Sequence, residues 1–504
     1  YMKHTLLTAL VALSLSAPAM AADYFVVVPM PGKVGLTPPG GGEVVSPDPE
    51  SPPPSSPNVQ LREYALPVAE RLTAYSFDLN SVLDVTGDVT FSSNQVAWQI
   101  VSGELPQGLS LTAQGAITGA PQVRADAGVS FEVQADYKGV PDQQTYLITV
   151  LGAKFKASQV AAGSNYSCAL SDTHQVWCWG VNTFGQLGTG ASGGAASQVP
   201  VNITAFFGNR TVVELAANNV HTCARTNDHK VWCWGASVRN GFADHRLVPT
   251  EVPNLAEGAR KLALGSGHTC ALTQLGGVKC WGYNIEGALG DGTGQHSATP
   301  VALSSLGTNV SDLVAGLDNT CAKKPDGWWC WGRNGNGELG LGDTTPRYVP
   351  VRQTHGYSFV SYHLGANFAC GMTAQGAVYC IGRNDYGQLG IGVTGNRAYY
   401  TLVEGLPTDS ITLSLGTAGA CVRGASQLRC WGRNHQGQLG DGTTIDRLSP
   451  VAIPQLVASQ VVSGGTHRCA VAEQSFMKCW GSNTSGQLGD GATTTQPSPV
   501  FVRY

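Results

Sequence analysis

Short apolar runs recur from residue 156 to the end of the chain, and glycine, proline or polar turn residues bound each of them. A typical unit begins with the run 160–163, continues with Cys-Ala-Leu and a polar turn, and then reads Val-x-Cys-Trp-Gly. Asn-x-x-Gly-Gln-Leu-Gly, a loop and Pro-Val complete the unit. Short runs between turn signals predict β-strands, so each unit is expected to hold several of them.

This unit occurs seven times between residues 156 and 504, and the first cysteines of successive units lie 47 to 55 residues apart. A period of about 50 residues with several strands per repeat is typical of propeller blades. We therefore predict an all-β fold in which residues 156–504 form a seven-bladed β-propeller.

Each unit carries two cysteines that are 9 or 10 residues apart. Both spacings place the pair at directly opposed positions of a hairpin, within reach of a disulfide. Zinc sites typically use Cys-x-x-Cys knuckles, and none occurs here. We predict seven disulfides, each within one blade: Cys168–Cys178, Cys223–Cys233, Cys270–Cys280, Cys321–Cys330, Cys370–Cys380, Cys421–Cys430 and Cys469–Cys479.

The chain before the repeats falls into three parts. Residues 1–21 contain Lys3 and His4, an apolar run and a small-residue end, which is typical of a secretory signal peptide. Residues 22–62 are rich in proline, glycine and serine and predict an extended linker. Residues 63–152 contain alternating runs and have the size of one β-sandwich.

Composition narrows the choice of partner. The formal net charge is -4, so the chain has no basic field for nucleic acid or an anionic membrane. No later apolar run reaches the length of a membrane-spanning helix. The signal peptide implies an oxidising compartment, where paired cysteines persist. We expect a secreted, extracellular or cell-surface protein, with the periplasm as the alternative.

Three segments carry a family resemblance: WCWGVNTFGQLGTG (177–190), CWGRNHQGQLGDGTT (430–444) and CWGSNTSGQLGDGAT (479–493). They resemble repeats of the regulator of chromosome condensation family, which implies a seven-bladed propeller with four-stranded blades. The cysteines depart from the nuclear pattern of that family and suit secretion. LPQGLSL (105–111) and GAITGAP (115–121) resemble the putative-Ig, cadherin-like modules of bacterial surface proteins. That resemblance implies an Ig-like spacer or adhesive module over 63–152.

Positions that recur in most units are predicted to be structural, because all blades share the same packing. A tryptophan follows the second cysteine in six units and is expected in the core between blades, with sugar stacking as the alternative. Ile381 replaces it in the fifth unit. His221, His268 and His467 each precede a first cysteine by two residues and are expected to be packing or hydrogen-bonding residues. The six tryptophans are Trp179, Trp234, Trp281, Trp331, Trp431 and Trp480.

Positions that break the repeat are candidates for binding, because loops are free to vary. The second unit lacks the Gly-Gln-Leu-Gly turn, and the fifth carries an unusual loop with arginine and tyrosine. Three units carry an arginine at one equivalent position, which predicts an arc that meets carboxylate or phosphate groups. The alternative is ordinary solvated loop charge. The candidate binding residues are Arg239, Phe242, His245, Arg246, Arg333, Arg383, Arg433, Arg397, Tyr399 and Tyr400.

The chain carries no HExxH, P-loop or paired-carboxylate motif. We therefore expect no catalytic residue, no cofactor and no metal site. The function that fits best is a binding or adhesion protein whose propeller presents a loop face to an extracellular protein or glycan. A secreted enzyme inhibitor is the alternative. An enzyme or a guanine-nucleotide exchange factor is the alternative from another class, and the signal peptide, the disulfides and the negative charge oppose it.

Overall fold

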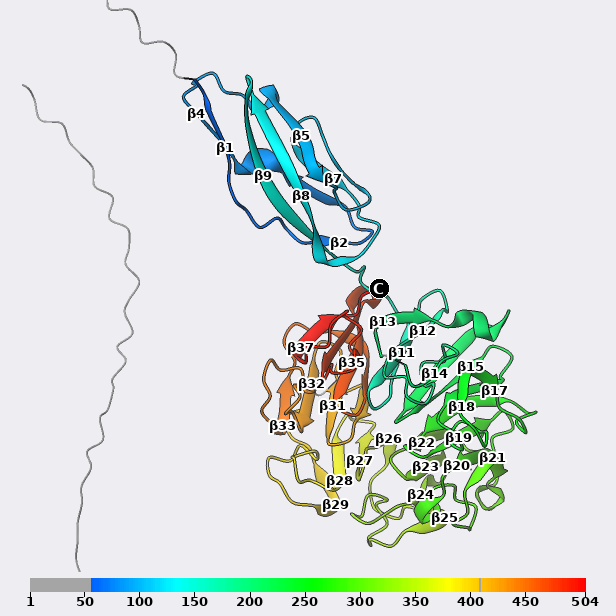
Figure 1. The fold of residues 1–504 in the computed structure, drawn as a ribbon. Helices are drawn as coiled ribbons and strands as arrows, with labels where there is room; N and C mark the ends of the chain where they lie inside the picture. Colours follow the sequence, from blue (N-terminus) through cyan, green and yellow to red (C-terminus); the bar gives the residue numbers. More distant parts are fainter. Residues whose placement is uncertain (1–55, 195, 408) are drawn as a thin grey trace, which may run out of the picture. The chain divides into compact units, whose positions relative to one another are not determined.

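The computed structural model describes residues 56–194, 196–407 and 409–504. The expected signal peptide and residues 22–55 of the expected linker lie outside this range. The described chain consists of a β-sandwich and a ring of seven four-stranded sheets (Figure 1). None of its helices is long and apolar enough to cross a membrane. The helices are short 3-10 turns at Leu79–Val82, Ser93–Gln95, Thr204–Phe207, Ile285–Gly287, Ser304–Leu306 and Glu473–Ser475.

The β-sandwich begins earlier than expected, inside the predicted linker. Val59 and Leu61 alternate with polar residues and are buried, so Asn58–Leu61 forms a strand in spite of its proline-rich surroundings. The sheets are β1-β4, β2-β9-β8-β5 and β3-β7-β6. Their strands are β1 Asn58–Leu61, β2 Ala69–Glu70, β3 Tyr75–Asp78, β4 Leu83–Thr86, β5 Val96–Gly103, β6 Leu109–Leu111, β7 Ala116–Gly119, β8 Ala125–Tyr137 and β9 Val140–Leu151.

Each propeller blade is an antiparallel sheet of four strands that are consecutive in sequence. The first strand of each blade lines the central channel, and the fourth forms the outer edge. Blades 1 to 3 are β10 Gln159–Ala162, β11 Tyr166–Leu170, β12 Val176–Gly180, β13 Ser197–Asn202; β14 Val212–Asn218, β15 His221–Thr226, β16 Val231–Gly235, β17 Arg246–Glu251; and β18 Ala259–Leu264, β19 His268–Thr273, β20 Val278–Gly282, β21 Ser297–Ala302.

Blades 4 to 7 repeat the same order. They are β22 Asp312–Ala315, β23 Asn319–Lys324, β24 Gly327–Gly332, β25 Arg347–Arg352; β26 Phe359–Leu364, β27 Phe368–Thr373, β28 Val378–Gly382, β29 Arg397–Leu402; β30 Thr412–Leu415, β31 Gly419–Arg423, β32 Leu428–Gly432, β33 Arg447–Ala452; and β34 Ala458–Ser463, β35 His467–Ala472, β36 Met477–Gly481, β37 Gln496–Phe501. The predicted seven-bladed propeller is confirmed.

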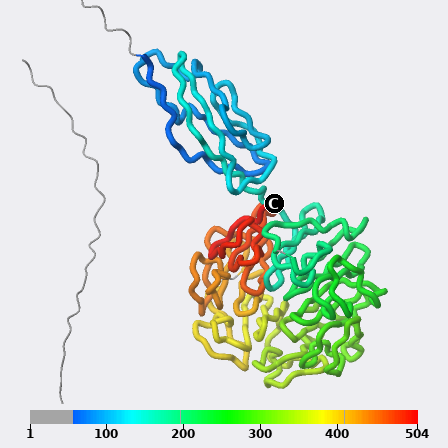
Figure 2. The backbone as a smooth tube through the Cα atoms, viewed as in Figure 1, coloured from blue at the N-terminus to red at the C-terminus, as the bar shows by residue number. Residues whose placement is uncertain are grey.

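The ring closes where blade 7 meets blade 1, which lie side by side in Figure 2. The segment that leads into blade 1 bonds to the end of the chain: Phe155 N donates to Val502 O at 2.8 Å, and Ala153 N donates to Tyr504 O at 3.1 Å. The backbone therefore joins the first and last blades directly.

All seven predicted disulfides are present. In every blade the two cysteines are direct partners across the second and third strands, and their Cα atoms lie 4.1 Å apart. The hairpin register that the spacing predicted is therefore correct for spacings of both 9 and 10.

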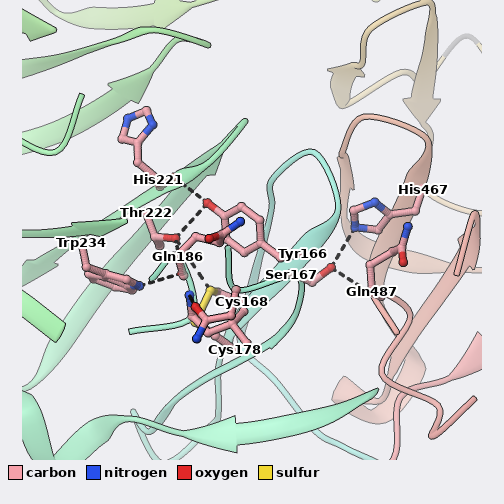
Figure 3. Close-up of a disulfide and its surroundings, with 12 residues drawn as sticks. Tyr166, Ser167, Cys168, Cys178, Gln186, His221, Thr222, Trp234, His467 and Gln487 are labelled. Carbon is pink, nitrogen blue, oxygen red and sulfur yellow. Dashed lines mark hydrogen bonds between the residues drawn. A yellow bond between two sulfur atoms is a disulfide. The ribbon is translucent and has the colours of Figure 1, made fainter. Parts of the chain in front are cut away.

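The seams between blades explain why the tryptophans recur (Figure 3). Trp234 is fully buried, and its Nε1 donates to the carbonyl of Gln186 in the preceding blade at 2.9 Å. Thr222 Oγ1 donates to the same carbonyl at 3.2 Å. A side chain at Gly188 would collide with the indole of Trp234, so this position needs glycine. The same tryptophan-to-carbonyl bond forms at Trp179, Trp331, Trp431 and Trp480.

Three histidines add a second bond across the seams. His467 Nε2 lies 2.8 Å from Ser167 Oγ. His221 Nε2 lies 2.8 Å from Thr269 Oγ1, and His268 Nε2 lies 2.7 Å from Thr320 Oγ1. Burial lowers the pKa of His221 to about 3 and the pKa values of His268 and His467 to about 4, so these rings are neutral. The structural interpretation of the histidines and tryptophans is confirmed.

The seam between blades 4 and 5 is built differently, because Ile381 takes the tryptophan position. Tyr400 fills the space and is only 7% exposed, so the expectation that it belongs to a binding face is wrong. Its hydroxyl lies 2.8 Å from Tyr362 Oη and accepts a bond from Gln353 Nε2 at 3.2 Å. Gln353 Nε2 also donates to Leu339 O at 2.7 Å. A polar and aromatic cluster thus replaces one indole.

A candidate binding face formed by the propeller loops

The loops that join the third and fourth strands of the blades lie on one face of the propeller, which we call the loop face. The shorter loops between first and second strands surround the channel on the same face, because antiparallel neighbours reverse direction at each turn. The described parts of the loops between third and fourth strands are 181–194 with 196, 236–245, 283–296, 333–346, 383–396, 433–446 and 482–495.

A repeated asparagine fixes the shape of these loops. Asn334 Oδ1 accepts from Leu339 N at 3.0 Å, and six of the seven blades make this bond. Blade 2 has no such asparagine, and its loop is held by Asn240, whose Oδ1 accepts from Phe242 N at 2.9 Å. The departure in blade 2 is therefore a different loop conformation and not a deletion of the turn alone.

The predicted arginine arc lies on the loop face, but two of its members are already paired. Arg383 Nε lies 2.6 Å from a carboxylate oxygen of Asp385. Arg333 Nε lies 3.9 Å from Glu286 and 4.0 Å from Glu338. The third member is Arg433, and it forms no ion pair with a carboxylate of the described residues. The arc is thus not a continuous anion site.

Two arginines instead form cation–π stacks with tyrosines that the sequence comparison missed. The Arg239 guanidinium lies 4.4 Å from the ring centroid of Tyr283, and its Nε donates to Ser266 O at 3.2 Å. The Arg433 guanidinium lies 4.8 Å from the ring of Tyr386. Both stacks cross a seam, since each arginine and its tyrosine belong to neighbouring blades. A comparison of every loop position, and not only of unusual stretches, would have found both tyrosines.

Histidines approach the same aromatic rings. His296 lies 4.8 Å from Tyr283, and His435 lies 6.1 Å from Tyr386, in both cases edge to face. The predicted His245 lies 5.4 Å from Phe184 of the preceding blade, and its Nδ1 accepts from Ser237 N at 2.8 Å. The loop face therefore presents aromatic rings at three seams.

The remaining predicted residues lie at the outer ends of the loops or beyond them. Arg246 covers the ring of Phe242 at 4.2 Å and pairs with Asp244 at 3.1 Å. Arg397 begins β29 and donates to Gly395 O at 3.0 Å. Tyr399 is 68% exposed on the outer strand β29 and not in a loop. The structure therefore does not gather all ten residues into one site.

Two acidic residues on this face, Glu338 and Asp318, were also missed in the sequence analysis. Glu338 is fully buried where four other blades carry glutamine, and burial raises the pKa of its carboxyl group. Burial raises the pKa of Asp318 as well. The signal was present in the repeat, because Gly-Glu-Leu-Gly stands where other units read Gly-Gln-Leu-Gly.

The propeller has a central channel with a volume of about 550 Å³. The first strands of all seven blades line it, mostly with alanine, glycine, leucine and serine. Within residues 56–194, 196–407 and 409–504, no three His, Cys, Asp or Glu side chains gather in a way that would hold a metal ion. The geometry of the face suits contact with a ligand through stacked rings and guanidinium groups.

These features define a seven-bladed β-propeller, with one disulfide inside each blade, that follows an Ig-like sandwich in the sequence. A family model described as an RCC1-like domain matches residues 128–456, and one described as a putative Ig domain matches residues 58–151. The chain belongs to the RCC1-like domain family. The expected family resemblances are both confirmed.

Known relatives match only part of their own length. The chain is 32% identical to the ultraviolet-B receptor UVR8 of Arabidopsis thaliana over 178 residues, which is 34% of this chain and 40% of that protein. It is 30% identical to the human E3 ubiquitin-protein ligase HERC2 over 197 residues, which is 37% of this chain and 4% of that protein.

Solved structures support the same fold. Yeast RCC1 (Prp20), solved with Kap60, aligns with a TM-score of 0.55 at 22% identity and covers 61% of this chain and 78% of its own. Human WBSCR16 aligns with a TM-score of 0.58 at 21% identity and covers 66% of this chain and 90% of its own. At this identity the likeness describes the propeller fold alone.

Proposed function

We propose that this chain is an extracellular binding protein whose propeller holds a protein or glycan ligand on its loop face. The observation that carries the proposal is the pair of cation–π stacks, Arg239 on Tyr283 and Arg433 on Tyr386. Arginine and tyrosine, together with tryptophan, are the side chains enriched among residues that dominate binding energies. Both pairs stand at positions where most blades carry other residues.

Recurrent positions of the repeat have structural roles and variable positions lie on the loop face, and this difference supports binding rather than catalysis. The recurrent tryptophans and histidines are buried in the seams, and all of them except Trp281 already hold a hydrogen-bond partner there. The side chains left for contact with a ligand are those of the loop face. A rigid scaffold that carries variable loops is the usual arrangement of a binding module.

The disulfides support an extracellular site of action. Disulfides form and persist in oxidising compartments and are rare in the cytosol. A receptor is among the relatives, as UVR8 is named an ultraviolet-B receptor, but the alignment spans less than half of that protein. We therefore base the proposal on the loop face and not on the activity of a relative.

The test is to probe the labelled full chain on arrays of glycans and of extracellular proteins, and then to measure affinity for the ligand found. Tyr283→Ala and Tyr386→Ala are each expected to lower affinity by about 30-fold, the effect of losing a residue that contributes about 2 kcal/mol. Thermal stability should change little, because both rings are only half-buried and lie in loops.

A matched control exists on the opposite face of the propeller. Arg210 covers the ring of Trp232 at 5.1 Å and pairs with Asp228, which reproduces a cation–π stack away from the loop face. Arg210→Ala should leave affinity unchanged. If it weakens binding as much as the loop-face variants do, or if Tyr283→Ala and Tyr386→Ala bind normally, the loop face is not the binding surface.

A further inference from the structure

Blade 7 contains a buried arginine that breaks the repeat at a strand position. Arg468 precedes the first cysteine of its blade and is 3% exposed, and it is the one buried arginine or lysine of the described residues. The other six blades carry small residues at this position: Ser167, Thr222, Thr269, Thr320, Ala369 and Ala420. A buried charge is costly unless a counter-charge accompanies it, so this substitution needs a physical reason.

The protein itself supplies only neutral partners for the guanidinium. Its Nη1 donates to Gln438 O at 2.5 Å, and its Nε donates to Ser463 Oγ at 3.1 Å. No carboxylate of the described chain forms an ion pair with Arg468, and burial lowers the pKa of the group to about 9. Gly419 leaves the space that Nη2 occupies, since a side chain there would collide with it. The seam is thus shaped around an unneutralised cation.

A small hollow with a volume of about 10 Å³ adjoins this guanidinium. That is room for about one water-sized group, such as a carboxylate oxygen. Arg433 lines the same hollow, and among the described residues its Nε donates to His435 Nε2 and it forms no ion pair with a carboxylate. Glycine-rich backbone at Gly416 and Gly464 completes the wall. Two cations therefore face a space that fits one end of an anionic group.

The hollow lies beside the central channel, because Thr417, Ser463 and Gly464 line both. Ser414 Oγ lies 3.0 Å from Ser463 Oγ, so a chain of polar groups runs from the channel wall to Arg468. Near its mouth the channel offers mainly hydroxyl and amide side chains, with Leu317 as a large apolar exception. The hydroxyl and amide side chains are Ser164, Asn218, Asn219, Ser266, Ser414 and Thr417.

We propose that this combined site binds a sugar acid, with its carboxylate on Arg468 and Arg433 and its hydroxyl groups on the channel wall. Arginine binds carboxylates through paired, charge-assisted hydrogen bonds. The channel volume lies within the roughly 300–1,000 Å³ of small-ligand sites. The inference deepens the proposed glycan binding by naming a ligand class. It shares Arg433 with one of the two stacks, but it also rests on Arg468 and the channel, which neither stack involves.

The experiment is calorimetric titration of the full chain with D-galacturonate and with D-galactose, which has the same ring without the carboxylate. Galacturonate is expected to bind at least about tenfold more tightly than galactose, as removal of a strong charged contact implies. Acetate, which has the carboxylate without the ring, should bind more weakly than galacturonate. Equal binding of galactose would overturn the role of the arginines, and equal binding of acetate would overturn the role of the channel.

Arg468→Thr is the matched variant, because blades 2, 3 and 4 carry threonine at this position. Thr222 Oγ1 bonds the loop carbonyl of the preceding blade, so the variant should fold and keep its melting temperature. Loss of galacturonate binding in this variant is the expected result, and unchanged binding would overturn the proposal. Tyr283→Ala should keep galacturonate binding. Its effect on the loop-face ligand is measured separately, so failure of one proposal does not imply failure of the other.

Discussion

Two seams of the same propeller fill the space between neighbouring blades with different side chains. At the seam between blades 5 and 6, Trp431 fills the space and donates to Gln388 O at 2.9 Å. At the seam between blades 4 and 5, Ile381 is too small, and Tyr400, Tyr362 and Gln353 take over both the volume and the hydrogen bonds. The comparison teaches that a departure from the repeat is not by itself a sign of function.

The compensation is visible position by position. Where blade 5 has Tyr400, blade 6 has Pro450, and where blade 5 has Tyr362, blade 6 has Leu413. Several unusual residues that are scattered along the sequence thus belong to one packed cluster. Departures that are only half-buried on the loop face, such as Tyr283 and Tyr386, are the ones left for binding.

The largest expected effect is that of acid, which should destabilise some seams between blades more than others. The pKa values of His221, His268 and His467 are lowered from 6.5 to between about 3 and 4, so the native state binds fewer protons than the unfolded state. The stabilisation is complete above about pH 6.5 and is lost as the pH falls toward 4. Acidification should therefore lower the free energy of unfolding by several kcal/mol through the three histidines together. Each tenfold weakening of proton binding by a histidine corresponds to roughly 1.4 kcal/mol.

Denaturant unfolding between pH 7 and 4 measures this loss. His268→Asn, which copies Asn319 of blade 4, should reduce the slope of stability against pH. Amide exchange at low pH should rise first in the blades that His221, His268 and His467 join. A pH profile that is flat over this range would contradict the assignment of neutral buried histidines.

Trp431 and Ile381 should each fit only their own seam, and replacing each by the other residue type tests this. Trp431→Ile lacks the tyrosines that support Ile381 and should cost about 3 kcal/mol of stability, the lower end for a large-to-small core change. Ile381→Trp should cost about 1–3 kcal/mol, because Tyr400 already occupies the space. Both are measured by denaturant unfolding. A neutral Trp431→Ile variant would mean that the indole is not needed at the common seam.

Much of this architecture could be predicted from the sequence, because spacing alone determines it. Cysteines 9 or 10 residues apart must face each other on a hairpin, and a recurrent tryptophan beside them must pack between sheets. The position of Tyr400 could not be predicted, since neighbouring strand residues point to opposite sides and Tyr399 and Tyr400 look alike in sequence. The stacks of Arg239 and Arg433 were missed because each joins residues of two different repeats.

The smallest expected effect distinguishes these two adjacent tyrosines. Tyr400→Phe removes a hydroxyl that contacts Tyr362 and Gln353, so it should lower stability by about 1 kcal/mol. Tyr399→Ala removes a side chain that is 68% exposed and should change stability by less than about 0.5 kcal/mol. Thermal melts of the two variants test this difference. A larger loss at Tyr399 would reverse the assignment of core and surface.

The most direct test of the central claim measures ligand affinity and melting temperature together for two double variants. Tyr283→Ala with Tyr386→Ala should abolish binding on the glycan or protein array while the melting temperature stays within a few degrees of that of the parent chain. Tyr362→Phe with Tyr400→Phe should lower the melting temperature and leave binding intact. The opposite pattern, in which the seam variant loses the ligand and the loop-face variant keeps it, would contradict the account.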